Sequence, residues 1–277
     1  MLFDTHTHIN LWNLPKREKE ILENLQKNNV KYFCNIWTDL NTSKKSIEIA
    51  KKTWNFASIW IHPCDVYEYD LEKTINSLEK MYLENKDVVV AIWECWLDYY
   101  WLKPENDKKI ASFEKNYQEK IINLRKKLQK IFFKAQINLA KKYDLPVIIH
   151  NRESKDDIFE ILKEENYKNF IFHCYSENLD YAKKLLEFSP NCKISFSGIV
   201  TFKNASEIKQ TAKNIPLKNI LIETDAPYLT PTPFRWKKEN EPSFVKYTLD
   251  EIISLREENP EDIEKQIFQN SLEIYKI

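Results

Sequence analysis

Glycine is almost absent from this chain. It occurs once in 277 residues, at position 198, although average usage near 7% predicts roughly 19. Tryptophan, in contrast, occurs eight times. A domain with many tight turns ordinarily relies on glycine, because glycine adopts positive φ angles without a steric penalty. The shortage of glycine is therefore abnormal for a folded domain.

Several other features are missing. The net charge is zero, from 42 basic and 42 acidic residues, which argues against coating of nucleic acid by bulk charge and leaves room only for a local basic groove. No apolar run approaches the roughly 20 residues of a membrane span, and the N-terminus lacks a secretory signal. The five cysteines contain no CxxC pair, and their odd number indicates reduced thiols. We therefore expect a cytoplasmic protein that does not associate with membranes.

Short apolar runs alternate with longer amphipathic segments along the chain. The predicted strands cover residues 2–6, 31–36, 56–62, 88–94, 146–150, 170–174, 193–197 and 220–224. The predicted helices cover residues 15–28, 41–53, 71–85, 113–143, 155–164, 178–188 and 204–213. Strands that alternate with helices indicate parallel βαβ units, and eight units predict a (β/α)8 TIM barrel that spans residues 1–277 as one domain. A doubly wound open sheet is the alternative.

One connection is unusual. Residues 103–125 are highly charged and longer than a simple link between elements. We interpret the segment as an extended, solvated helix, with a substrate lid as the alternative.

Histidines and carboxylates gather where predicted strands end. The residues at these ends are His6, His8, His62, His150, His173, Glu94 and Asp225. In a barrel, the C-terminal strand ends build the active site. Imidazoles with carboxylates suit one or two divalent transition metals, and a metal pair can promote hydrolysis. A single buried histidine is more often a core residue, but burial alone would not place all five at one rim. Asp225 could bind metal and accept the proton of a water.

Seven short motifs resemble a known family. They are "DTHTH" (4–8), "IHPCD" (61–65), "AIWECWLDYY" (91–100), "LPVIIHNR" (145–152), "FHCYS" (172–176), "ETDAPYLTP" (223–231) and "RWKKENEP" (235–242). In this order they resemble the TatD family of metal-dependent deoxyribonucleases, which are metallo-dependent hydrolase barrels. The resemblance covers almost the whole chain.

The resemblance implies a role for each site residue. The implied metal ligands are His6, His8, Glu94, His150, His173 and Asp225, which would hold two divalent ions (Mg, Mn or Zn). Glu94 would bridge the ions, and Glu94 with Asp225 would be catalytic. His62, Arg152 and Arg235 are weaker candidates for phosphate contact; the alternatives are a structural histidine, a solvated arginine and a salt-bridge-forming arginine. Glu223 lies two residues from Asp225 and could support a ligand. The implied activity is cleavage of phosphodiester bonds in single-stranded DNA, from a 3′ end, by a monomer.

Two other functions are open at this stage. One is hydrolysis of C–N bonds by an amidohydrolase, although many amidohydrolases carry a modified lysine where this chain has Glu94. The other is a catalytically impaired barrel that binds nucleic acid.

The resemblance also offers an explanation for the tryptophans. The family places glycine where this chain has Trp60, Trp93, Trp96 and Trp236, and commonly at Trp37. Some bacteria read the codon UGA as glycine, whereas another genetic code reads it as tryptophan. We predict that these five positions are glycine in the native protein, and Trp12, Trp54 and Trp101 are further candidates. The alternative is a set of genuine tryptophans on which bases stack.

Overall fold

The protein is described from a computed structural model that covers residues 1–36, 39–59, 66–92 and 97–277. Some positions singled out in the sequence lie outside these ranges. They are His62 and Glu94 of the candidate site, and Trp37, Trp60, Trp93 and Trp96.

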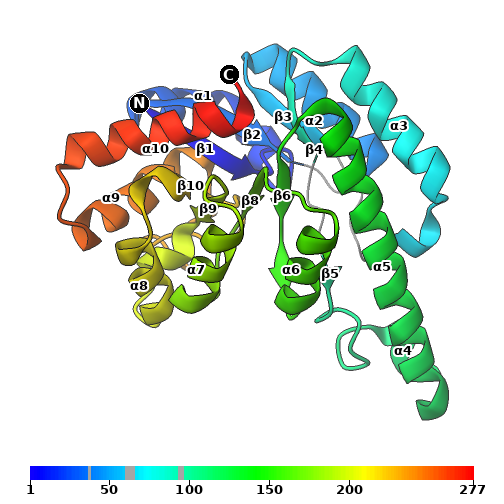
Figure 1. The fold of residues 1–277 in the computed structure, drawn as a ribbon. Helices are drawn as coiled ribbons and strands as arrows, with labels where there is room; N and C mark the ends of the chain where they lie inside the picture. The colour runs from blue at the N-terminus through cyan, green and yellow to red at the C-terminus, as the bar shows by residue number, and fades with distance from the viewer. Residues whose placement is uncertain (37–38, 60–65, 93–96) are drawn as a thin grey trace.

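Eight parallel strands form the centre of the molecule (Figure 1). In spatial order they are β1 (Leu2–Thr7), β2 (Val30–Asn35), β3 (Phe56–Ile59), β4 (Val89–Ile92), β6 (Val147–Ile149), β8 (Phe170–Phe172), β9 (Lys193–Phe196) and β10 (Ile220–Ile222). Each matches a predicted strand. The order follows the sequence without reversal, whereas a doubly wound sheet reverses at a switch point.

Backbone hydrogen bonds connect the first strand to the segment after the last one. The His8 N–H donates to the Ala226 carbonyl at 2.7 Å, and the Asp225 N–H donates to the His6 carbonyl at 2.9 Å. These bonds bring β1 and the end of β10 together, so the sheet curls into a nearly closed barrel. The predicted TIM barrel is therefore confirmed, and the doubly wound alternative is wrong.

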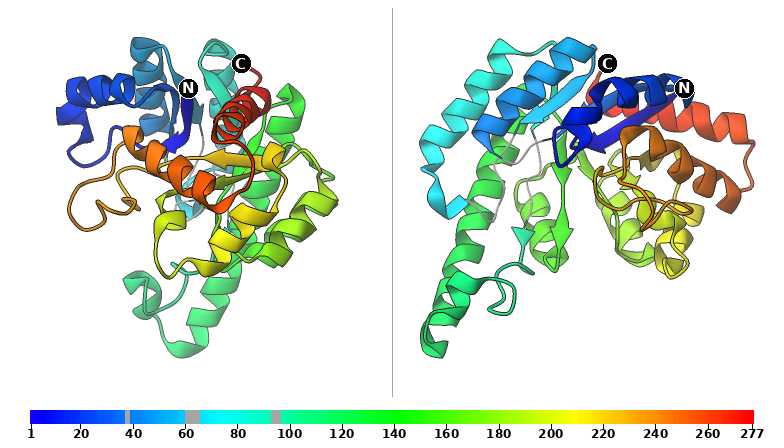
Figure 2. Two further views of the ribbon diagram at one scale, coloured as in Figure 1. Left: turned by 90° about the vertical axis from the view of Figure 1, so that its left-hand side faces the viewer. Right: turned by 180° about the vertical axis from the view of Figure 1, so that it is seen from behind.

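The strands are buried on both faces because helices cover the outside of the barrel (Figures 1 and 2). Branched and aromatic residues such as Phe33, Ile59, Ile149 and Phe172 are almost fully buried. Each buried side chain of this size contributes about 1.5–3 kcal/mol to folding. The resulting rigid core is the support for the strand ends.

The outer helices are α1 (Glu18–Lys27), α2 (Leu40–Thr53), α3 (Leu71–Glu84), α5 (Lys115–Tyr143), α6 (Lys155–Glu164), α7 (Leu179–Phe188), α8 (Ser206–Asn214), α9 (Val245–Leu255) and α10 (Pro260–Tyr275). Short 3-10 turns cover Leu14–Arg17, Val66–Glu68, Gly198–Thr201, Leu217–Asn219 and Pro242–Phe244. The last two α-helices lie outside the predicted helical segments. Their sequence did carry a signal, because the Asn259 side chain caps α10 by accepting the Glu261 N–H, and Pro260 follows at the first turn.

Residues 99–128 form a projection that we call the arm. It starts after β5 (Leu97–Asp98), which pairs with β7 (Asn151–Arg152), and contains α4 (Lys108–Ala111) and the first half of α5. Figures 1 and 2 show that α4 and this half of α5 extend well beyond the other helices. In the 103–125 segment, residues 108–111 and 115–125 are helical and residues 103–107 and 112–114 are not, so the extended-helix interpretation is confirmed in part. The β5–β7 pair was not predicted.

The helices of the structure were predicted not to cross a membrane. Among the described residues, no helix combines the length and the apolar character that a membrane crossing requires.

Candidate metal centre

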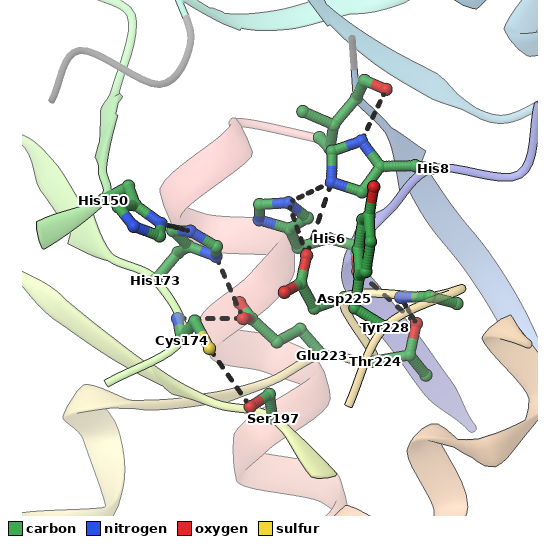
Figure 3. Close-up of polar contacts among 12 residues, drawn as sticks. His6, His8, His150, His173, Cys174, Ser197, Glu223, Thr224, Asp225 and Tyr228 are labelled. Atoms are coloured by element: carbon green, nitrogen blue, oxygen red, sulfur yellow. Dashed lines mark hydrogen bonds and ion pairs between the residues drawn. The ribbon is translucent and has the colours of Figure 1, made fainter. Parts of the chain in front are cut away.

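Three donor atoms from opposite ends of the chain meet at the barrel rim (Figure 3). The Nε2 atoms of His6 and His8 lie 3.1 Å apart, and both approach Oδ1 of Asp225, at 3.3 and 3.4 Å. Metal–nitrogen bonds of about 2.0–2.1 Å in a tetrahedral site place ligand atoms roughly 3.3–3.4 Å from one another. The spacing of these three atoms therefore fits one divalent ion.

A second group of polar side chains adjoins the first. His150 Nδ1 lies 2.9 Å from His173 Nε2, and the His173 ring stacks on the His6 ring with centroids 3.9 Å apart. His6 and His173 also lie with the Glu223 carboxylate in one compact group of potential ligand atoms. Because His6 belongs to both groups, the two parts of the rim form one continuous cluster.

Hydrogen bonds orient two of the imidazoles. The His8 Nδ1–H donates to the Ile36 carbonyl at 3.0 Å, and the His173 Nδ1–H donates to Glu223 Oε1 at 3.1 Å. The same Glu223 oxygen accepts the Cys174 N–H at 2.8 Å, which holds the carboxylate in place. Each ring therefore keeps Nε2 as its lone-pair nitrogen, as a metal ligand must.

Burial sets the charge states in the cluster. Removal from water, together with neighbouring His173, His8 and His150, lowers the pKa of His6 well below its usual range. A neutral imidazole is the form that binds metal. Burial raises the pKa of Asp4 well above its usual range. The Asp4 carboxyl group accepts the N–H and the hydroxyl of Thr224, at 2.8 and 2.6 Å, and so links β1 to the segment after β10.

The structure thus brings His6, His8, His150, His173 and Asp225 together, as the sequence predicted. Asp4, two residues before His6, is fully buried and contacts Thr224, which directly precedes Asp225. Sequence reasoning overlooked the Asp4–Thr224 link. The alternation of side chains along a strand is a local pattern, so it cannot reveal a contact between residues 220 positions apart.

The two predicted phosphate-binding arginines lie on different sides of the cluster. Arg235 packs on Phe202, 3.7 Å from the ring centroid, and lines a pocket of about 560 Å³ together with Tyr228. The Tyr228 ring lies 6.1 Å from the His8 ring, so this pocket adjoins the cluster. Arg152 follows His150 by two residues and stacks on Tyr100 at 3.7 Å. Tyr228 was not predicted, although it stands within the "ETDAPYLTP" motif.

The family model of the TatD related DNases matches residues 3–276 of this chain. The chain belongs to the TatD family. Among its relatives, the metal-dependent hydrolase YabD of Bacillus subtilis is 35% identical over 280 residues, which cover 100% of both chains. A metal-dependent hydrolase of Mycoplasma genitalium is 33% identical over 99% of this chain and 98% of its own length. This TatD protein is therefore a member of a group of metal-dependent hydrolases.

Solved structures agree on the fold. The crystal structure of the TatD homologue YJJV from Escherichia coli superposes with a TM-score of 0.84 at 23% identity, over 100% of this chain and 98% of the other. A TatD family hydrolase from Entamoeba histolytica gives a TM-score of 0.79 at 21% identity, over 99% and 97%. At these identities the structures support the barrel, and the chemistry has to be argued from the cluster.

Proposed function

We propose that this TatD protein is a divalent-metal-dependent nuclease that hydrolyses phosphodiester bonds in single-stranded DNA, starting from the 3′ end. The observation that supports this most is the continuous cluster in which two groups of ligand atoms share His6. A site that holds two adjacent cations is suited to a phosphodiester, because the attacking and leaving oxygens both carry negative charge in the transition state. The deoxyribonuclease family to which the chain belongs supports the same substrate class.

The donor set assigns residues to each ion. His6, His8 and Asp225 would hold one ion, and His150 and His173 would contribute to the second. By resemblance to the family, Glu94 would bridge the two. Divalent ions such as Mg²⁺, Mn²⁺ or Zn²⁺ supply Lewis acidity, which activates water near neutral pH and neutralises phosphate charge. Histidine-rich ligation favours Mn²⁺ or Zn²⁺ over Mg²⁺, which prefers oxygen ligands.

The protein side chains perform the remaining tasks. The Asp225 carboxylate is partly exposed at the rim, where it can take the proton of the attacking water. The hydrogen bond from His173 to Glu223 keeps the imidazole in one orientation. The guanidinium groups of Arg152 and Arg235 flank the cluster and can bind the phosphates on either side of the cleaved bond.

The test is an assay on single-stranded oligonucleotides labelled at the 5′ or the 3′ end. Protein freed of metal with a chelator is supplied with Mg²⁺, Mn²⁺ or Zn²⁺, and products are separated by length. We expect a metal-dependent ladder that shortens from the 3′ end and no cleavage by Asp225→Asn. Cleavage of a cyclic amide but of no phosphodiester would indicate an amidohydrolase. Metal-independent DNA binding without cleavage would indicate the impaired binding barrel.

A further inference from the structure

The arm carries an excess of positive charge that the rest of the chain lacks. Residues 99–128 contain eight basic and four acidic side chains, whereas the remaining sequence contains 34 basic and 38 acidic ones. The zero net charge of the protein therefore conceals a separation of charge. The positive part is concentrated on the arm and on the stretch of α5 that follows it.

The basic residues of the arm fall into two classes. Some are held by carboxylates: Arg125 pairs with Asp107 at 2.5 Å, and Lys103 pairs with Glu153 at 2.7 Å. Four exposed lysines form no ion pair with any residue that the structure describes; they are Lys108, Lys115, Lys120 and Lys127. The paired residues fix the shape of the arm, and the four lysines leave its surface positively charged.

The base of the arm adjoins the metal-ligand cluster. Asp98, the last residue of β5, is paired in the sheet with Arg152, which follows the cluster residue His150 by two positions. The Arg152 guanidinium stacks on Tyr100, at the start of the arm. Gln129 of α5 accepts the Asp98 N–H at 3.1 Å, which fixes α5 to the same point. A strand that passes over Arg152 would therefore continue directly onto the arm.

We propose that the arm is a second binding surface for the backbone of a single-stranded nucleic acid, which it holds beyond the segment bound at the cluster. This rests on the proposed function, because the occupant is the polyanionic strand that the cluster cleaves. Exposed lysines attract phosphates through counterion release, and the exposed rings of Phe113 and Tyr117 offer surfaces on which bases stack. Long strands reach the arm, and short ones do not.

The test compares two quadruple variants. The first replaces Lys108, Lys115, Lys120 and Lys127 with alanine. The control replaces four exposed lysines on other helices, Lys44, Lys183, Lys213 and Lys265, and so changes net charge equally. Binding of oligonucleotides of 5 and 30 nucleotides is measured by fluorescence anisotropy across a salt series, with Ca²⁺ in place of a catalytic metal. Hydrolysis of bis(p-nitrophenyl) phosphate reports on the cluster alone.

We expect the arm variant to bind the 30-mer about 10-fold more weakly than the control variant, with the 5-mer unaffected. The salt dependence should fall by up to about 3 units, at roughly 0.7 for each lost phosphate contact. Equal binding by both variants would overturn the proposal, as would an equal loss for both lengths. If the arm variant differs from the control in sedimentation but not in oligonucleotide binding, the proposal is overturned. The exposed residues Tyr117, Leu124 and Ile131 would then belong to a contact with a protein. Failure of the unmodified protein to cleave any diester would refute the proposed nuclease. The comparison of 30-mer binding between the arm variant and the control variant would still test the arm as a binding surface.

A second inference comes from backbone conformation. The structure describes four tryptophans, and three of them have positive φ angles: 51° at Trp12, 57° at Trp54 and 66° at Trp236. Trp54 stands at the C-terminal cap of α2 in the left-handed conformation, a position where glycine is most common. The side chains of Trp54 and Trp236 are 87% and 89% exposed, so no packing compensates for the unfavourable backbone.

The only glycine in the sequence serves a different purpose. Gly198 does not have a positive φ, but a Cβ atom there would lie 2.2 Å from the Leu229 carbonyl oxygen. Three of the eleven positive-φ positions among the described residues therefore hold tryptophan, while the remaining glycine is needed for space. We infer that residues 12, 54 and 236 are glycine in the protein as its own cell makes it; position 101 has no positive φ, and the inference does not extend to it.

Peptide masses of the protein from its native source decide this directly. We expect glycine at positions 12, 54 and 236. Tryptophan at the first three positions would refute the inference. In the chain as written, Trp54→Gly should shift the urea midpoint of unfolding upward, because a left-handed conformation carries a steric cost for any residue other than glycine. The matched variant Trp101→Gly should lower it, and the opposite pattern would also contradict the inference.

Discussion

The metal-ligand cluster and the arm use polar side chains in opposite ways. In the cluster, His6, His173 and Glu223 are buried, and their potential ligand atoms lie within 4.8 Å of one another. On the arm, exposed lysines extend from α4 and α5, and ion pairs hold only other basic residues, such as Arg125 and Lys103. Buried polar groups must have partners or a ligand, because an unsatisfied buried group costs free energy, whereas exposed charges are stabilised by water.

The contrast indicates that the cluster sets the specificity for the cleaved bond and that the arm sets the affinity for the polyanion. A preorganised cluster determines which bond is broken, since its atoms cannot move without disturbing the barrel. An exposed basic surface changes how long a polyanion stays bound, and it acts through salt-dependent attraction. Variants in the two regions should therefore affect different measured quantities.

The largest effect is expected at Asp225. Replacement of Asp225 by asparagine removes the negative charge that faces both His6 Nε2 and His8 Nε2. We expect the rate of diester hydrolysis to fall by about 10³-fold, similar to the loss of an essential electrostatic group. Turnover and bound metal should be measured on the same sample. If the variant keeps both its turnover and its bound metal, Asp225 is not part of the metal centre.

A smaller effect is expected at Glu223, which contacts the His173 ring and acts through it. Glu223→Gln keeps the shape but weakens the acceptor for the Nδ1–H, so metal affinity should fall by about 10–100-fold. The readout is metal titration, which a purely structural defect would not change. Glu241→Gln is the control, because Glu241 is also buried but pairs with Arg17 away from the cluster. Equal metal affinities in both variants would contradict the positioning role.

The smallest effect is expected at the junction of the two regions, where Asp98 is fully buried between β5 and the arm. Burial raises its pKa from 3.8 to about 6 in the folded protein. The folded state therefore holds a proton more tightly than the unfolded state, and stability should fall as the pH rises from about 4 to 6. Asp98→Asn should abolish this loss and stabilise the protein by about 1–3 kcal/mol at pH 8 but not at pH 4. Urea unfolding at both pH values checks the prediction, which a destabilised variant at pH 8 would refute.

Much of the fold could be predicted from the sequence, because apolar residues repeat with different periods in strands and in helices. The eight apolar runs predicted all eight strands of the barrel. The four described histidines, His6, His8, His150 and His173, lie at the C-terminal ends of these strands or directly after them. The helices α9 and α10 lacked a following strand and so escaped the βαβ pattern. The short β5–β7 pair could not be predicted, because two residues carry no periodicity.

The sequence by itself determined the strands, the residue types at their ends and the family motifs, since these depend on local pattern. Only the tertiary structure decided which of those residues meet. The ring contact between His6 and His173, the link from Asp4 to Thr224 and the hydrogen bond from Tyr275 to the Thr5 carbonyl join positions between 167 and 270 residues apart. Such contacts arise when the barrel curls, because the packing of the whole sheet, and no local preference, sets the distance between its first and last strands.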